Sequence, residues 1–150
     1  MSIARKLDYQ IRLFVVLGAD PVAHFSNQMP TPRILVVDDE IAVLKYMVMI
    51  LRRHGYEVHS ATDASAALQA VEQLSCGLNL LITDIAMPGV SGDELVRSLR
   101  RICPYVDVLV VSGAMQEGGK GLVNCPVLKK PFLPTALTAA VIEILNSQIH

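Results

Sequence analysis

Short apolar runs alternate with longer amphipathic stretches from residue 33 to the end of the chain. Runs such as Ile34–Val37 are apolar at every position, which is typical of strands covered on both faces. Between such runs, apolar residues recur every three or four positions, which predicts helices that pack through one face. One such series is Ile41, Leu44, Val48 and Leu51. Because strands and helices alternate, right-handed crossovers make the sheet parallel, and we predict an α/β fold with a five-stranded parallel sheet flanked by helices on both faces.

Local signals bound the predicted elements. The predicted strands cover residues 34–37, 58–61, 78–83, 106–111 and 126–128. Asp63 is placed to cap one helix, and Ser91 with Glu94 forms a capping box at the start of another. Gly55 closes the first helix of the predicted domain, and Pro134 stands at a favoured early position of the last one.

The chain divides at Met29–Pro32, because two prolines in three residues cannot continue a helix. Upstream, helical spacing of apolar residues predicts one amphipathic helix over residues 3–17. We therefore predict an N-terminal extension over residues 1–32 and a single domain over residues 33–150. Almost nothing follows the last predicted helix, so we expect no further domain after it, unless the chain is a fragment of a larger protein.

The charge balance argues against one class of partner. The 150 residues include 13 basic and 14 acidic side chains, a formal net charge of −1. Binding to a phosphate backbone needs a basic excess, so we expect no direct nucleic-acid partner. No apolar run approaches the roughly 18 residues of a membrane span, so we expect no membrane partner either.

The cysteines Cys76, Cys103 and Cys125 are odd in number and form no CxxC pair. Their spacing fits neither a disulfide framework nor a zinc site. We expect buried free thiols in a reducing compartment, and therefore a cytoplasmic protein.

Polar residues follow four of the predicted strands directly. Asp38 and Asp39 end the first strand, Asp84 the third, Ser112 the fourth and Lys130 the fifth. The carboxyl ends of parallel strands share one edge, where ligands bind beside the switch in strand order. We expect these side chains to converge there.

Three ionised carboxylates held close together repel one another, and one lysine cannot neutralise them all. An all-oxygen site of this kind suits Mg²⁺, with Mn²⁺ as an alternative. Mg²⁺ keeps open positions that lend themselves to phosphoryl chemistry, and an aspartate can itself accept a phosphoryl group. The residues alone therefore predict an acidic Mg²⁺ site with a phosphorylatable aspartate.

With these motifs in order, residues 33–146 resemble a two-component response-regulator receiver domain. The segments that carry the resemblance are Ile34–Glu40, Leu80–Gly89, Val110–Gly113 and Lys130–Phe132. The resemblance implies the flavodoxin-like receiver fold, which agrees with the fold predicted from the hydrophobic pattern.

The resemblance also implies roles. Asp84 would accept a phosphoryl group from the phosphohistidine of a sensor histidine kinase or histidine phosphotransfer protein. Asp38 and Asp39 would bind Mg²⁺ together with Asp84 and the backbone carbonyl of Ala86. Such a protein is a signalling switch that catalyses its own phosphorylation and dephosphorylation, not an enzyme with a separate substrate.

Lys130 would bind the phosphoryl group, preceding Pro131 in a cis peptide bond, and the neighbouring Lys129 is the competing lysine. Ser112 would hydrogen-bond a phosphoryl oxygen and couple the chemistry to a change of conformation. The downstream protein target is not identified by the sequence. Whether the last helix and strand form a homodimer stays open as well.

Two features depart from the family pattern. Val127 stands where the family often has a switch tyrosine or phenylalanine. The segment between Ser112 and Lys130 is short and contains Gly118, Gly119 and Gly121, so we expect the fourth helix to be short or irregular. Both departures concern the output surface.

Three alternatives remain open. The first is a receiver-like interaction module that works without phosphorylation. The second is a nucleotide-binding P-loop at residues 114–121, although Ala114 and Gly121 replace the first glycine and the metal-binding hydroxyl. The third is an aspartyl phosphatase, although Ala86 stands where its second aspartate would be.

Overall fold

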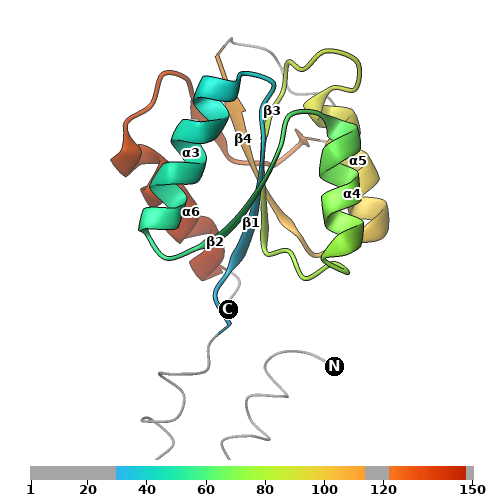
Figure 1. The fold of residues 1–150 in the computed structure, drawn as a ribbon, viewed down its shortest axis with the longest axis horizontal. Coiled ribbons are helices and arrows are strands. Elements are labelled where there is room, and N and C mark those ends of the chain that lie inside the picture. Colours follow the sequence, from blue (N-terminus) through green and yellow to red (C-terminus); the bar gives the residue numbers. More distant parts are fainter. Residues whose placement is uncertain (1–29, 114–121, 148–150) are drawn as a thin grey trace, which may run out of the picture. The chain divides into compact units, whose positions relative to one another are not determined.

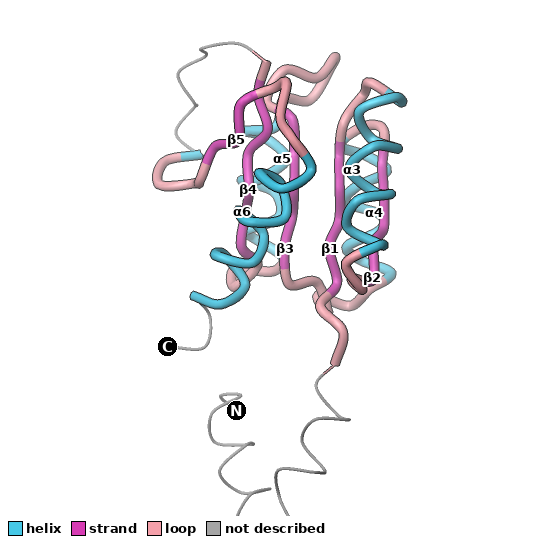
Figure 2. The backbone as a smooth tube through the Cα atoms, turned by 90° about the vertical axis from the view of Figure 1, so that its left-hand side faces the viewer, coloured by secondary structure: helices cyan, strands magenta, loops and turns pink. Residues whose placement is uncertain are grey.

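A five-stranded parallel sheet forms the centre of the molecule, in the order β2-β1-β3-β4-β5. The computed structural model describes residues 30–113 and 122–147. The strands are β1 (Arg33–Val37), β2 (Glu57–Ala61), β3 (Leu80–Asp84), β4 (Asp107–Ser112) and β5 (Val127–Lys129). They lie side by side in Figure 2, as the predicted fold requires.

Helices cover both faces of the sheet, which confirms the predicted architecture. They are α3 (Ile41–Arg53), α4 (Ala64–Gln73), α5 (Gly92–Ile102) and α6 (Pro134–Ser147). Figure 1 shows α3 and α6 on one face and α4 and α5 on the other. The Asp63 carboxylate accepts from the Ala66 N–H at 2.8 Å, and the capping box of Ser91 and Glu94 is present.

The apolar strands divide their side chains between two cores because successive residues of a strand point to opposite faces. In β1, Leu35 and Val37 pack under α4 and α5, whereas Ile34 and Val36 pack under α3 and α6. Burial on both faces explains why every position from Ile34 to Val37 is apolar.

The strand order reverses at β1. The chain runs from β1 outward to β2 through α3, then returns through α4 to β3 on the other side of β1. The carboxyl ends of β1 and β3 therefore lie next to each other at a topological switch point, where open α/β sheets bind ligands.

Several sequence-based predictions fall outside the described residues. They are the helix over residues 3–17, most of the irregular fourth helix, and the P-loop-like segment at residues 114–121. The division into an extension and a domain stays a prediction. Of the helices in the described ranges, none has both the length and the apolar character needed to cross a membrane.

The expectation of three free thiols was wrong. Cys76 and Cys103 form a disulfide, with their Cα atoms 5.6 Å apart. Cys76 follows the end of α4 and Cys103 caps the end of α5, and these helices pack against each other on one face of the sheet. The two cysteines are 27 residues apart in the sequence, so their proximity could not be predicted from spacing. It arises because α4 and α5 pack against each other. Cys125 is a free, half-buried thiol.

Candidate functional site

Three carboxylates meet at the switch point, as the strand ends predicted. Asp38 follows β1 directly, Asp39 is the next residue, and Asp84 is the last residue of β3. One oxygen from each carboxylate lies within 4.8 Å of the others. Asp38 is fully buried and Asp84 is 6 % exposed, whereas Asp39 faces solvent. The pocket is thus buried at Asp38 and Asp84 and open to solvent at Asp39.

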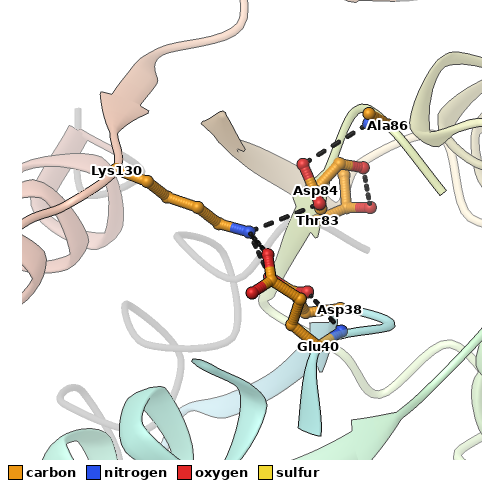
Figure 3. Close-up of polar contacts among 6 residues, drawn as sticks. All are labelled: Asp38, Glu40, Thr83, Asp84, Ala86 and Lys130. Atoms are coloured by element: carbon orange, nitrogen blue, oxygen red, sulfur yellow. Dashed lines mark hydrogen bonds and ion pairs between the residues drawn. The ribbon is translucent and has the colours of Figure 1, made fainter. Parts of the chain in front are cut away.

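Lys130 directly follows the edge strand β5, and its side chain extends toward Asp38 and Asp84 (Figure 3). Its Nζ lies 2.7 Å from Oδ2 of Asp38 and 3.3 Å from Oδ2 of Asp84. A weaker ion pair at 3.6 Å reaches Oε1 of Glu40, whose side chain is largely exposed. The sequence identified Lys130 and the aspartates but missed Glu40, because a glutamate near the start of a helix has an ordinary structural role.

The backbone holds Lys130 in place. Its N–H donates to the Ser112 carbonyl at 2.8 Å, and the Lys130–Pro131 peptide is cis, as the resemblance implied. The competing Lys129 is the last residue of β5 and is exposed. Of the two lysines, Lys130 is therefore the one within reach of the carboxylates.

Local hydrogen bonds orient both buried carboxylates. Oδ1 of Asp38 accepts from the Glu40 N–H at 2.9 Å, and Oδ1 of Asp84 accepts from the Ala86 N–H at 3.4 Å. The Thr83 hydroxyl donates to the backbone oxygen of Asp84 at 2.9 Å (Figure 3). In each aspartate, Oδ1 is bound by its own loop and Oδ2 faces Lys130.

The two remaining predicted residues lie at the same edge. Ser112 is the last residue of β4 and is buried, and its backbone carbonyl accepts a hydrogen bond from the Lys130 N–H. Ala86 is exposed in the loop after β3, two residues beyond Asp84. All six predicted site residues thus belong to adjoining strand ends or to the loops that follow them.

Burial and charge shift two pKa values in the pocket. Burial raises the pKa of the Asp84 carboxyl, and the charge of Asp38 adds to this, while Lys130 opposes it. For Lys130, burial acts to lower the pKa, but the hydrogen bond and charge of Asp38 and the charge of Asp84 prevail and raise it. Lys130 therefore remains a cation, and Asp84 is costly to ionise while it has no further positive partner.

The donor set fits a hard divalent cation. Three carboxylates against one lysine leave the pocket with an excess of negative charge, and the available donors are all oxygen atoms. Mg²⁺ and Mn²⁺ prefer such ligands. A cation bound by Asp38, Asp39 and Asp84 would relieve the repulsion that burial intensifies.

Gly92 is a further site residue that the sequence reading did not single out. It is the first residue of α5, and a Cβ atom there would collide with the backbone oxygen of Asp84 and lie 3.1 Å from Cα of Ile85. Its N–H donates to the Ile85 carbonyl at 3.0 Å. In the sequence, the sign of this role was that Gly92 directly follows the capping residue Ser91. That sign is weak, because a glycine at the start of a helix is common.

An open hollow of about 560 Å³ adjoins Lys130. Its apolar wall includes Val43 and Tyr46 of α3 and Phe132 of the loop after β5. The rings of Tyr46 and Phe132 lie 6.0 Å apart between centroids. A partner that reaches the carboxylates can therefore make apolar contacts beside them.

Comparison with known proteins identifies one family. The response regulator receiver domain matches residues 34–142. A receiver domain protein from Methanospirillum hungatei JF-1 has 32% sequence identity and a TM-score of 0.72, over 79% of this chain and 96% of that one. The receiver domain of the hybrid histidine kinase CckA has 34% identity and a TM-score of 0.66, over 75% of this chain and 98% of that one.

Two curated relatives are longer proteins. Sensor kinase CckA of Brucella abortus (strain 2308) is 33% identical over 121 residues, which are 77% of this chain and 13% of the kinase. Aerobic respiration control protein ArcA of Escherichia coli (strain K12) is 32% identical over 127 residues, 81% of this chain and 52% of ArcA. The chain thus matches about half or less of these relatives' length.

Proposed function

The chain belongs to the response regulator receiver domain family, and from this premise we propose that Asp84 is the phosphoacceptor of a two-component phosphorelay. Receiver domains are signalling modules that interact with histidine kinases. The donor we propose is the phosphohistidine of a sensor histidine kinase or of a histidine phosphotransfer protein. The observation that carries the proposal is the single Lys130 ammonium shared by the carboxylates of Asp38 and Asp84.

In the proposed transfer, a carboxylate oxygen of Asp84 attacks phosphorus in line with the histidine nitrogen. The new P–O bond makes an acyl phosphate as the P–N bond breaks, and the imidazole keeps the electron pair and takes up a proton. Because the carboxylate of Asp84 is oriented by the Ala86 N–H through Oδ1, its Oδ2 is the oxygen that faces the open pocket. Lys130 would offset charge on the phosphoryl oxygens.

The residues proposed to hold Mg²⁺ are Asp38, Asp39, Asp84 and the backbone carbonyl of Ala86, with Mn²⁺ as a substitute. When bound, the cation would supply positive charge to the phosphoryl oxygens, which a lone lysine does not provide in full. The closeness of the three carboxylates supports this assignment.

Ser112 is proposed to hydrogen-bond a phosphoryl oxygen and to shift the backbone after β4. Its carbonyl accepts from the Lys130 N–H, so a movement of either residue is passed to the other. Such a shift would tip a two-state equilibrium and alter protein contacts around residues 112–132. Position 127 on β5 is an exposed valine, so this output would not use the rotation of an aromatic ring there.

The proposal is tested with acetyl phosphate as the donor, with and without Mg²⁺, by intact mass. Wild-type protein should gain one phosphoryl group only with Mg²⁺, and Asp84→Asn should gain none. A gain in Asp84→Asn would reject Asp84 as the acceptor. If the folded wild type fails with acetyl phosphate and also with a phosphohistidine donor, the phosphorylation-independent interaction module becomes the better interpretation.

A further inference from the structure

The Cys76–Cys103 disulfide closes a covalent ring of the chain that contains Asp84, the last residue of β3. Cys76 lies just before β3, and Cys103 is the C-cap residue of α5. Between them the chain runs through all of β3, the loop after Asp84, and all of α5. The ring therefore includes Asp84 and α5, whose first residue, Gly92, lies against the Asp84 backbone. Cys76 lies before the start of β3 and Cys103 after the end of α5, so both cysteines are at the ends of these elements that are away from Asp84.

The two cysteines of the pair differ in exposure. Cys76 is exposed, whereas Cys103 is 4 % exposed and belongs to the core under α4 and α5. Thiol–disulfide exchange requires a thiolate to reach a sulfur atom, so a small reagent in solution can react at Cys76. Exchange that begins at the exposed Cys76 does not require a reagent to reach the buried Cys103 directly.

The turn that presents Cys76 is unusual for residues with side chains. Ser75 and Cys76 both have positive φ, 48° and 58°, which L-residues rarely adopt. On its other side, a Cβ at Gly77 would lie 2.7 Å from the Arg33 guanidinium, so the turn is tightly seated. The conformation brings Cys76 back toward the end of α5, and opening the bond removes one of the constraints that hold it.

We propose that Cys76 and Cys103 are a reversible dithiol/disulfide site, which reacts with low-molecular-weight disulfides of the glutathione type and controls the stability of the segment that carries Asp84. The Cys76 thiolate attacks the small disulfide, forms a mixed disulfide and releases one thiolate. The Cys103 thiolate then attacks the sulfur of Cys76, closes the protein disulfide and releases the second. The protein dithiol loses two electrons and two protons, and the small disulfide becomes two thiols.

The effect on the domain follows from chain entropy. A bond between residues 27 positions apart restricts the unfolded chain, so its opening lowers stability. The loss applies to the unfolding of the domain, including β3, the loop after it and α5, which lie inside the ring. None of the contacts described above for the carboxylate pocket involves Cys76 or Cys103, so we expect folded protein of either redox form to keep the same pocket.

The test uses the full chain equilibrated in buffers of oxidised and reduced glutathione at graded ratios. Free thiols are then trapped by alkylation and counted by mass, and the melting temperature is measured at each ratio. We expect one thiol, Cys125, in the oxidised form and three in the reduced form. The melting temperature should fall on the order of 10 °C between them.

Variants assign the transition. Cys125→Ser should keep both the two-thiol transition and the shift in melting temperature, whereas Cys76→Ser should abolish both and melt like the reduced wild type. Cys76 is the chosen position because it is exposed and its hydroxyl would meet water.

Three outcomes would overturn the proposal. The first is three free thiols at every ratio, and the second is a disulfide that the most reducing buffer leaves intact. The third is a change of thiol number without a change of melting temperature. None of them bears on phosphoryl transfer, since Mg²⁺-dependent phosphorylation by acetyl phosphate is measured separately on both redox forms.

Discussion

Gly92 has room for no side chain beside the backbone oxygen of Asp84. The first turn of α5 rests directly on the end of β3, and the Gly92 N–H is bonded to the Ile85 carbonyl. The position of α5 and the direction of the chain after Asp84 are therefore coupled. This close approach fixes the loop whose Ala86 N–H orients the Asp84 carboxylate.

We expect Gly92→Ala to destabilise the domain by about 1–3 kcal/mol, as overpacking of a well-packed site does. The obstacle is backbone, which cannot rotate away as a flexible side chain can. Urea unfolding measures the change. Gly113→Ala is the matched control, because among the described residues the nearest atoms to its Cβ would be those of the Lys130 side chain, at 3.9 Å. Equal stability of the two variants would show that α5 shifts freely.

Lys130→Met should separate the two roles of the lysine. Removing the ammonium should slow phosphorylation by about 100-fold or more, as the loss of one charge-stabilising donor does. It should also tighten Mg²⁺ binding on the order of tenfold, because Lys130 is a cation paired with two of the proposed metal ligands. Isothermal titration measures the affinity, and rates with acetyl phosphate measure the transfer.

Lys129→Met is the control for this experiment, since Lys129 is the adjacent residue and is exposed. It should change neither quantity. An unchanged or weaker Mg²⁺ affinity in Lys130→Met would contradict the electrostatic interpretation of the pocket.

Mg²⁺ should raise the melting temperature of the wild-type protein, because a ligand that binds only the folded state stabilises it, by about 2.7 kcal/mol at 100 times its Kd. Asp38→Asn should lose most of this gain. Glu40→Gln should keep it, because Glu40 contacts Lys130 at 3.6 Å and is exposed. Melting curves with and without Mg²⁺ measure the effect, and an equal gain in Asp38→Asn would remove Asp38 from the metal site.

The Glu57 carboxyl on the edge strand β2 should make the stability of the domain depend on pH. Glu57 of β2 lies opposite Arg33 of β1, and hydrogen bonds from His59 and Arg33 lower the pKa of the Glu57 carboxyl. A lowered folded-state pKa means a contribution that is present above the unfolded pKa and is lost as pH falls through the folded one. Wild type should therefore melt above Glu57→Gln near neutral pH.

This difference should be small, because the pair is exposed, and it should shrink as pH falls below about 4.5, the ordinary pKa of a glutamate, and through the lowered pKa of Glu57. Melting temperatures of both proteins across that range measure it. Glu72→Gln, an exposed position on α4, is the control. A difference that grows toward acid pH would reverse the assigned sign.

The fold and most of the pocket could be predicted from the sequence, because both depend on local pattern. Apolar runs such as Ile34–Val37 form strands buried on both faces, and the first polar residue after each run stands at the sheet edge. Parallel strands connected by helices place all these ends together, so Asp38, Asp84 and Lys130 could be grouped before any distance was known.

Contacts that depend on how separate helices and strands pack together were visible only in the three-dimensional structure. The contact of Glu40 with Lys130, the collision that a side chain at Gly92 would have with Asp84, and the Cys76–Cys103 bond each join segments brought close by packing. No periodicity or capping signal encodes such distances, because they are set by the crossing and docking of helices on the sheet. The cysteines show this most plainly, since their spacing alone led to the wrong expectation.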